Sequence, residues 1–230
     1  MSDRRDAGFR WWCAVTIFLS AFLLFQVQPI ISKMILPWFG GGPAVWTTCM
    51  LFFQVLLLAG YAYAHGMHST NRSIGRTVIH VVLLVLAVSM LPITPGTEWK
   101  PTDGAYPTWR ILSLLLVHVG LPYFMLSTTG PLVQTWYRRV CVDRSPYRLY
   151  ALSNIGSLGA LLSYPFLVEP NATTGTQGAV WSILFAVFGV VCAALAIWTY
   201  RATPPATSEE EPTRREEEAA VLEVARISFG

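Results

Sequence analysis

The chain has 230 residues, of which 53% are hydrophobic and 13% are charged. Soluble domains carry about 25% charged residues, so this composition argues against a water-soluble fold. The net charge of +3 is too small to indicate a nucleic-acid partner.

Runs without charged residues are long enough to cross a membrane several times. A spanning helix needs about 20 apolar residues, and a charge within the hydrocarbon core costs a few kcal/mol or more. We therefore expect an all-α polytopic membrane protein with six transmembrane helices, at residues 11–32, 43–64, 77–93, 111–128, 149–168 and 178–200. Gly40-Gly41-Gly42-Pro43 separates the first two, because a continuous helix tolerates this run poorly.

The two ends of the chain differ from its apolar middle. Residues 1–10 form a short N-terminal segment, 11–200 the six-helix domain, and 201–230 an acidic tail. The tail composition predicts disorder, although residues 219–229 hold enough apolar side chains for a short docking helix.

Lys and Arg fall unevenly between the predicted loops. With a cytoplasmic N-terminus, all but Lys33, Lys100 and Arg110 of the 16 Lys and Arg residues lie inside. Because cytoplasmic loops are enriched in these residues, both termini are predicted to be cytoplasmic.

Four cysteines suggest neither a disulfide nor a metal centre. Cys13, Cys49 and Cys192 lie in predicted spans, and Cys141 lies in an inside loop, where thiols stay reduced. None belongs to a Cys-x-x-Cys or Cys/His pattern, so we expect no disulfide, no metal and no cofactor. No nucleophile and base stand at helical spacing either, and we expect no catalysis.

Polar groups in the first span share one helix face. Gln26, Pro29 and Lys33 are spaced i, i+3, i+7, and Pro29 leaves the carbonyl of Phe25 without its helical donor. This face could bind a ligand. Alternatively, Gln26 bonds a neighbouring helix and Lys33 extends to the headgroups.

The fourth span is predicted to break at Ser127-Thr128-Thr129-Gly130-Pro131. Interrupted helices often line transporter sites, where freed backbone groups meet substrate. A simple loop followed by an interfacial belt at Trp136-Tyr137 explains the same residues.

Small residues line one side of the fifth span. Gly156, Gly159, Ala160 and Ser163 are expected to form a helix-packing surface that lets backbones approach closely. Asn154 is then predicted to be a buried amide with a partner. His80 and His118 lie inside spans, where each could carry a proton or be a core histidine with its own hydrogen bonds.

Helices joined by a short connection are usually neighbours, so the first two spans are expected to place Lys33 near Trp46 on the outer side, where a cavity could form. The candidate ligand-binding residues are Gln26, Lys33, Trp46, Gln54, Tyr61 and Asn154. Lys33 would be the only fixed charge there and would favour an anionic headgroup or a carboxylate.

Several long strings resemble one membrane-protein family. They are Leu24-Phe25-Gln26-Val27-Gln28-Pro29 with Lys33-Met34-Ile35-Leu36-Pro37, then Phe39 to Cys49, Gly60 to His65, and Pro146 to Asn154. Over residues 12–200 the chain is similar to the N-terminal membrane region of spermidine-synthase-like integral membrane proteins. That resemblance implies a transporter-like helical region fused to a cytoplasmic aminopropyltransferase domain, in a bacterial inner (plasma) membrane.

This chain departs from the family because it has no βαβ pattern and no glycine-rich turn for a nucleotide. Six helices resemble one half of a major-facilitator-type bundle. The first hypothesis is a non-catalytic membrane subunit or anchor that docks on a copy of itself or on a second subunit with a synthase-like domain. The alternative is a small transporter built as a homodimer of six-helix units.

Overall fold

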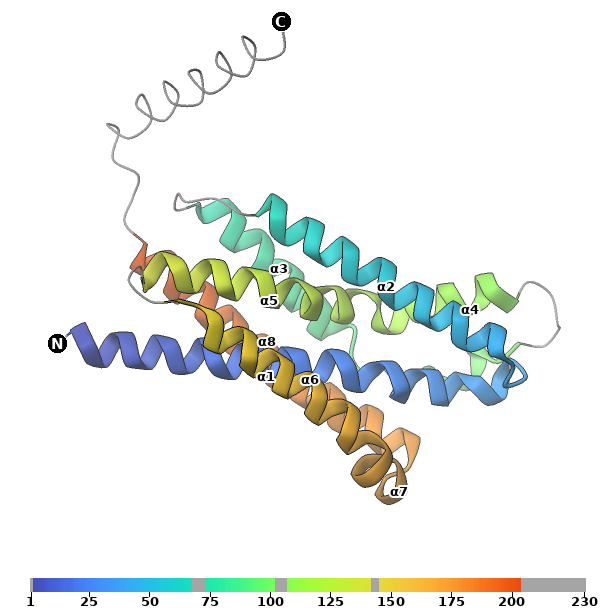
Figure 1. Ribbon diagram of the computed structural model, residues 1–230. Coiled ribbons are helices and arrows are strands. Elements are labelled where there is room, and N and C mark those ends of the chain that lie inside the picture. Colours follow the sequence, from blue (N-terminus) through green and yellow to red (C-terminus); the bar gives the residue numbers. More distant parts are fainter. Residues whose placement is uncertain (1, 68–72, 102–106, 142–144, 204–230) are drawn as a thin grey trace, which may run out of the picture.

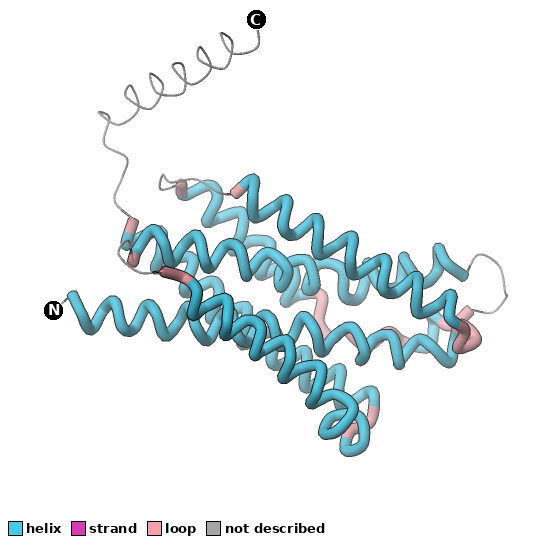
Figure 2. Tube along the Cα trace, viewed as in Figure 1, coloured by secondary structure: helices cyan, strands magenta, loops and turns pink. Residues whose placement is uncertain are grey.

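The fold is that of a computed structural model, which describes residues 2–67, 73–101, 107–141 and 145–203. These residues form helices joined by short loops, and no strand occurs among them (Figure 2). The predicted all-α class is confirmed. Nearly all of the predicted acidic tail lies outside the described residues.

The helices run back and forth along one axis (Figure 1). They are α1 (Ser2–Ile35), α2 (Pro43–Gly66), α3 (Ile74–Ser89), α4 (Pro107–Leu115), α5 (Leu121–Val140), α6 (Tyr147–Ser163), α7 (Glu169–Asn171) and α8 (Thr174–Ala202). The π-helical turns Leu116–Gly120 and Tyr164–Val168 join α4 to α5 and α6 to α7, and 3₁₀ turns cover Leu36–Trp38 and Thr97–Trp99.

Five stretches of the described residues are long and apolar enough to cross a membrane, which is compatible with an integral membrane protein. They are Ala7–Trp38, Pro43–Gly66, Pro107–Val140, Tyr147–Asn171 and Thr174–Ala202. The third predicted span corresponds to α3, which has 16 residues and is shorter than the roughly 20 that a span needs.

After α3, residues 90–96 continue without a helix. The helix was expected to reach Ile93 but ends at Ser89, because Pro92 lacks an N–H and disfavours helical geometry at the residue before it. Ile93 is fully buried, and its N–H donates to Ser182 Oγ of α8 at 3.3 Å. Non-helical backbone inside a helix bundle is tolerated where a neighbouring helix provides its hydrogen-bond partner, as Ser182 does here.

The predicted interruption between the first two spans is present. Gly40 and Gly41 have φ angles of 86° and 66°, a left-handed conformation that glycine adopts without strain. The chain therefore reverses here, and α2 begins at Pro43, as expected.

The predicted break at residues 127–131 is wrong, because α5 continues through Pro131 to Val140. The hydroxyl groups of this run bond to their own helix: Ser127 Oγ donates to the carbonyl of Phe124 at 2.7 Å, and Thr128 Oγ1 to that of Met125 at 2.8 Å. Membrane helices accommodate proline where hydroxyl side chains and adjacent helices supply alternative hydrogen bonds. The run is therefore part of a buried helix face rather than a loop.

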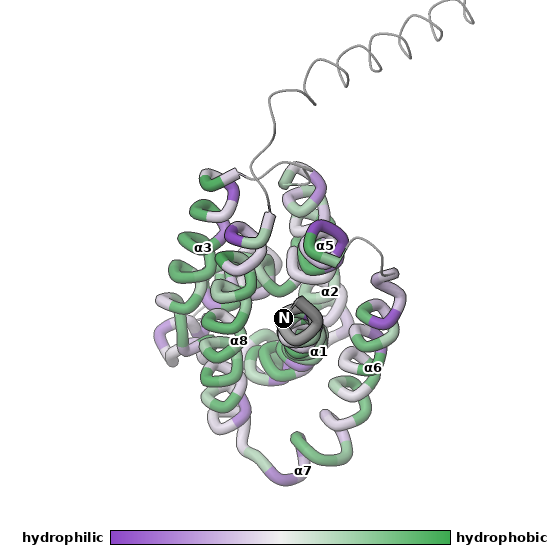
Figure 3. The backbone as a smooth tube through the Cα atoms, turned by 90° about the vertical axis from the view of Figure 1, so that its left-hand side faces the viewer, coloured by the Kyte–Doolittle hydropathy of each residue, from purple (hydrophilic) through white to green (hydrophobic). Residues whose placement is uncertain are grey.

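Helix α1 lies at the centre of the bundle, and α5, α6 and α8 pack along it (Figure 3). The closest approach to α6 is at Gly156, where an added Cβ would lie 2.9 Å from the carbonyl oxygen of Phe18. Ala160 is also buried, whereas an added Cβ on Gly159 would meet nothing within 4 Å. Only part of the predicted small-residue surface faces α1.

Charged residues of the described helices gather at the two ends of the bundle. Helices α2, α5 and α8 end, and α1, α3 and α6 begin, at the same end (Figure 1). We call this the arginine-rich end; its described helix termini hold Arg76, Arg138, Arg139, Arg148 and Arg201. Lys33, Lys100, Arg110 and Glu169 lie at the opposite end.

Candidate functional site

A groove of about 270 Å³ lies between α1, α2, α5 and α6. Eight polar side chains line it, and we call it the polar groove: Ser20, Gln28, Gln54, Tyr61, Tyr123, Ser127, Ser153 and Ser157. Apolar side chains of the same helices, among them Phe25 and Phe53, complete the lining. Such a mixture of apolar walls and a few polar groups is typical of ligand pockets.

A hydrogen bond between α1 and α5 forms one wall of the polar groove. Gln28 Nε2 donates to the hydroxyl of Tyr123 at 3.2 Å. The Tyr123 side chain is almost completely buried, and its ring packs on Phe53 of α2 with centroids 4.8 Å apart. This contact ties three helices together at the groove.

Helices α2 and α5 meet at Gly60 and Ser127. A Cβ at Gly60 would collide with the side chain of Ser127, so glycine allows the close approach of the two helices. Ser127 Oγ lies 2.7 Å from the carbonyl of Phe124 and 3.4 Å from that of Leu56. Because this hydroxyl is bonded to backbone carbonyls and no base adjoins it, it is not an activated nucleophile.

The described lining of the polar groove carries no Asp, Glu, Lys, Arg or His. Its groups are hydroxyls and amides, which donate and accept hydrogen bonds without fixed charge. This chemistry suits a neutral polar partner and provides no carboxylate for a polyamine.

Two of the six predicted ligand residues, Gln54 and Tyr61, line the groove. Gln26 does not, although it is buried: its Nε2 donates to the carbonyl of Ala160 at 3.0 Å and to Ser163 Oγ at 2.8 Å. Gln26 therefore lies in the contact between α1 and α6. This position agrees with the alternative in which Gln26 bonds a neighbouring helix instead of a ligand.

Lys33 and Trp46 lie away from the groove, toward the opposite end of the bundle. Lys33 forms an ion pair with Glu169, and the two side chains are 41% and 39% exposed. The expectation of Lys33 as a lone fixed charge is wrong, because Glu169 lies one residue beyond the predicted fifth span. Trp46 is in the first turn of α2 and is 41% exposed.

Asn154 was expected to be buried, but it is exposed on α6. It has no hydrogen-bond partner within the described part of the chain. The expectation fails because α6 touches α1 with the face of Gly156 and Ala160, and Asn154 lies about 160–200° around the helix from Gly156. The amide therefore points away from the bundle.

Each of the two histidines in the predicted spans contacts neighbouring side chains or backbone. His80 is buried, with Nδ1 3.4 Å from the hydroxyl of Tyr63 and Nε2 3.8 Å from Cys192 Sγ. His118 Nδ1 lies 3.0 Å from the carbonyl of Leu114, and its ring meets that of Trp99 edge to face.

Sequence reasoning missed several groove residues. Ser20 and Gln28 are eight residues apart, which places them on one face of α1, and Ser153 and Ser157 stand at i, i+4 on α6. Tyr123 had no comparable signal, because its role depends on contacts with α1 and α2.

Comparisons with known proteins identified no relative of this chain. No protein family matches the chain, and no similar protein was found among curated proteins or solved structures. Within the described residues, no group of three His, Cys, Asp or Glu side chains is placed to hold a metal ion.

Proposed function

We propose that this chain is a non-catalytic membrane subunit that pairs with a second membrane unit across the face formed by α1, α2, α5 and α6. The unit is a second copy or a subunit that carries a synthase-like domain. In this proposal the chain takes the place of the membrane half of the spermidine-synthase-like proteins that the sequence resembles, and of one half of a major-facilitator-type bundle. In this proposal the arginine-rich end, with both termini, faces the cytoplasm of a bacterial inner membrane.

The observation that carries the proposal is the polar groove on an uncovered face. Hydroxyl and amide groups in contact with hydrocarbon lack partners, and such groups normally face the interior of an assembly or a water-filled space. In a lone copy, the exposed Gln54 and Tyr61 would face lipid, and three further groove side chains, Gln28, Ser153 and Ser157, would be partly open to it. A partner over this face removes that cost.

The two helices that flank the groove are the least covered of the spanning stretches. In the most apolar part of each stretch, only 28% of the residues of α2 and 17% of those in the stretch that contains α6 are buried. The corresponding share is 61% in the stretch that contains α5. Each also exposes an amide: Gln54 on α2 and Asn154 on α6. Amide side chains hydrogen-bond across membrane helices, so these two residues favour protein over lipid as the covering material.

A small transporter built from two copies is the second candidate. The same groove would then line a passage between the copies, and its neutral hydroxyl and amide lining would suit an uncharged polar substrate. Binding of a neutral polyol, with loss of binding in Gln28→Leu, would favour this alternative over the subunit.

Cysteine cross-linking in membranes tests the pairing, because the four native cysteines are buried. Leu58→Cys on α2 and Leu158→Cys on α6 place thiols on exposed positions that are 70% and 57% accessible. Ile183→Cys on α8, 65% exposed and outside the proposed face, is the matched control. We expect a defined adduct from positions 58 and 158 and none from position 183.

An adduct of twice the chain mass identifies a second copy, and a heavier adduct whose second chain contains a synthase-like domain identifies a separate subunit. Cross-linking at position 183 alone, or at no position in membranes where the chain is abundant, would contradict the proposal.

A further inference from the structure

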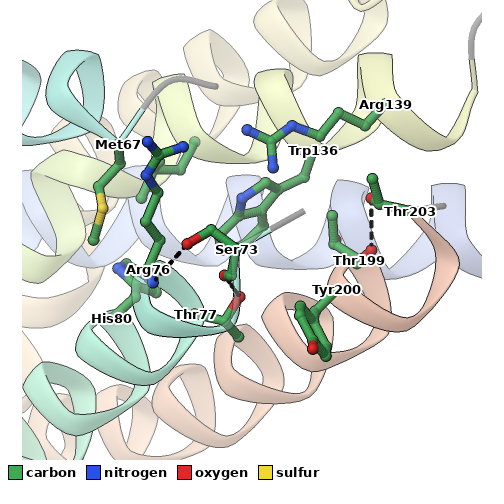
Figure 4. Close-up of a pocket in the computed structure, with 11 residues that line it drawn as sticks. Met67, Ser73, Arg76, Thr77, His80, Trp136, Arg139, Thr199, Tyr200 and Thr203 are labelled. Carbon is green, nitrogen blue, oxygen red and sulfur yellow. Dashed lines mark hydrogen bonds between the residues drawn. The ribbon is translucent and has the colours of Figure 1, made fainter. Parts of the chain in front are cut away.

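A second, smaller cavity lies at the arginine-rich end, between α3, α5 and α8 (Figure 4). Its volume is about 40 Å³, more than the 10–15 Å³ that one water molecule needs. None of its lining residues belongs to the polar groove, so this site is independent of the proposed pairing.

Two arginines from different helices line this cavity. Arg76 is in the first turn of α3 and Arg139 is in the last turn of α5. Figure 4 shows both guanidinium groups on the same side of the site, with the ring of Trp136 below the Arg139 guanidinium. Convergence of like charges on one cavity is favourable when an anion lies between them.

The N-terminus of α3 lies beside the arginines. Ser73 is the N-cap of α3, and its Oγ accepts from the N–H of Arg76 at 3.5 Å. The N-terminus of α3 thus directs its positive end toward the same cavity. Thr77 and Tyr200 also line the cavity, and the Thr77 hydroxyl donates to the carbonyl of Ser73 at 3.3 Å.

The Arg139 side chain is partly buried. Its Nε is covered by protein, and Trp136, which is 8% exposed, forms part of the same wall. Other described arginines at this end, including Arg138, Arg148 and Arg201, are exposed and do not line the cavity. General enrichment of arginine in cytoplasmic segments does not explain why two side chains meet at one cavity.

We propose that this cavity binds a phosphate group between Arg76 and Arg139. A guanidinium group matches phosphate oxygens in both charge and geometry. The cavity lies where three helices start or end, which is the depth of lipid headgroups in a spanning protein. Basic pockets between membrane helices bind anionic headgroups, so the phosphate comes from an anionic lipid or from a free phosphate.

Thermal unfolding of the full chain in a phosphate-free maltoside detergent tests the site. One arm adds inorganic phosphate and the other adds phosphatidylglycerol, with chloride at equal ionic strength as the reference. A higher unfolding temperature with inorganic phosphate identifies free phosphate as a sufficient ligand. A rise with phosphatidylglycerol alone identifies the lipid headgroup.

Arg76→Gln and Arg139→Gln should each weaken the apparent affinity about tenfold or more, since each removes a charge-assisted contact. Arg148→Gln, at the same end but outside the cavity, should leave the affinity unchanged. Arg76 is exposed, so Arg76→Gln tests the site even where Arg139→Gln impairs folding. The proposal fails if neither additive stabilises the parent beyond chloride, or if Arg148→Gln weakens binding as much as Arg76→Gln.

Discussion

Lys33, near the end of α1, forms an ion pair with Glu169, the first residue of α7. The pair ties the central helix to the connection between α6 and α8 at the end opposite to the arginine-rich end. Both side chains are partly exposed, so the surrounding medium screens their attraction.

Lys33→Met removes the ammonium group and leaves Glu169 without this partner. Exposed ion pairs contribute about 0–1 kcal/mol, so we expect a small fall in the unfolding temperature, and a smaller one at high salt. Thermal unfolding of Lys33→Met, Glu169→Gln and the double variant measures the coupling. Additive effects of the two single changes would mean that the pair contributes nothing.

Gly156→Leu should disrupt the contact between α1 and α6, because even a Cβ would lie 2.9 Å from the carbonyl oxygen of Phe18. Overpacking of this kind costs about 1–3 kcal/mol or more. Gly159→Leu is the matched control, since nothing lies within 4 Å of its added Cβ. Size-exclusion profiles after heating compare the two variants. Equal loss of stability at both positions would contradict the arrangement of α6.

Gln26→Leu should destabilise the same contact for a different reason. The change removes two hydrogen bonds to α6 and leaves the carbonyl of Ala160 and the hydroxyl of Ser163 without that donor. Interhelical hydrogen bonds in membranes are each worth about 0.6 kcal/mol and up to about 1.7 kcal/mol. We expect a loss of about 1–3 kcal/mol in unfolding experiments, and a smaller loss for Ser163→Ala, which keeps the bond to Ala160. A Gln26→Leu variant as stable as the parent would show that these bonds contribute little.

Cysteine accessibility tests the proposed orientation. Thr97→Cys and Ser145→Cys place exposed thiols at opposite ends of the bundle, and the native cysteines are buried. We expect a membrane-impermeant maleimide to label position 97 in intact cells and position 145 only after permeabilisation. The reverse pattern would invert the orientation, and labelling of both positions in intact cells would contradict the arrangement of the helices.

The sequence alone determined the features that depend on local composition. Long uncharged runs predicted the apolar helices, since a charge in hydrocarbon is costly wherever it falls along the chain. The run from Gly40 to Pro43 predicted the reversal before α2 because glycine and proline limit helices without help from distant residues. The positions of Lys33 and of the arginines along the chain likewise predicted that they lie at opposite ends of the helices.

Only the tertiary structure decided where polar side chains find their partners. Residues 127–131 read as a break, yet bonds within α5 and contacts with α2 keep the helix continuous. Asn154 and Gly156 are two positions apart on one helix, and the face that touches α1 decided which of them is buried. The meeting of Gln28 with Tyr123, and of Arg76 with Arg139, joins residues more than 60 positions apart. Helical periodicity orients a side chain on its own helix, but the packing of helices determines what that side chain meets.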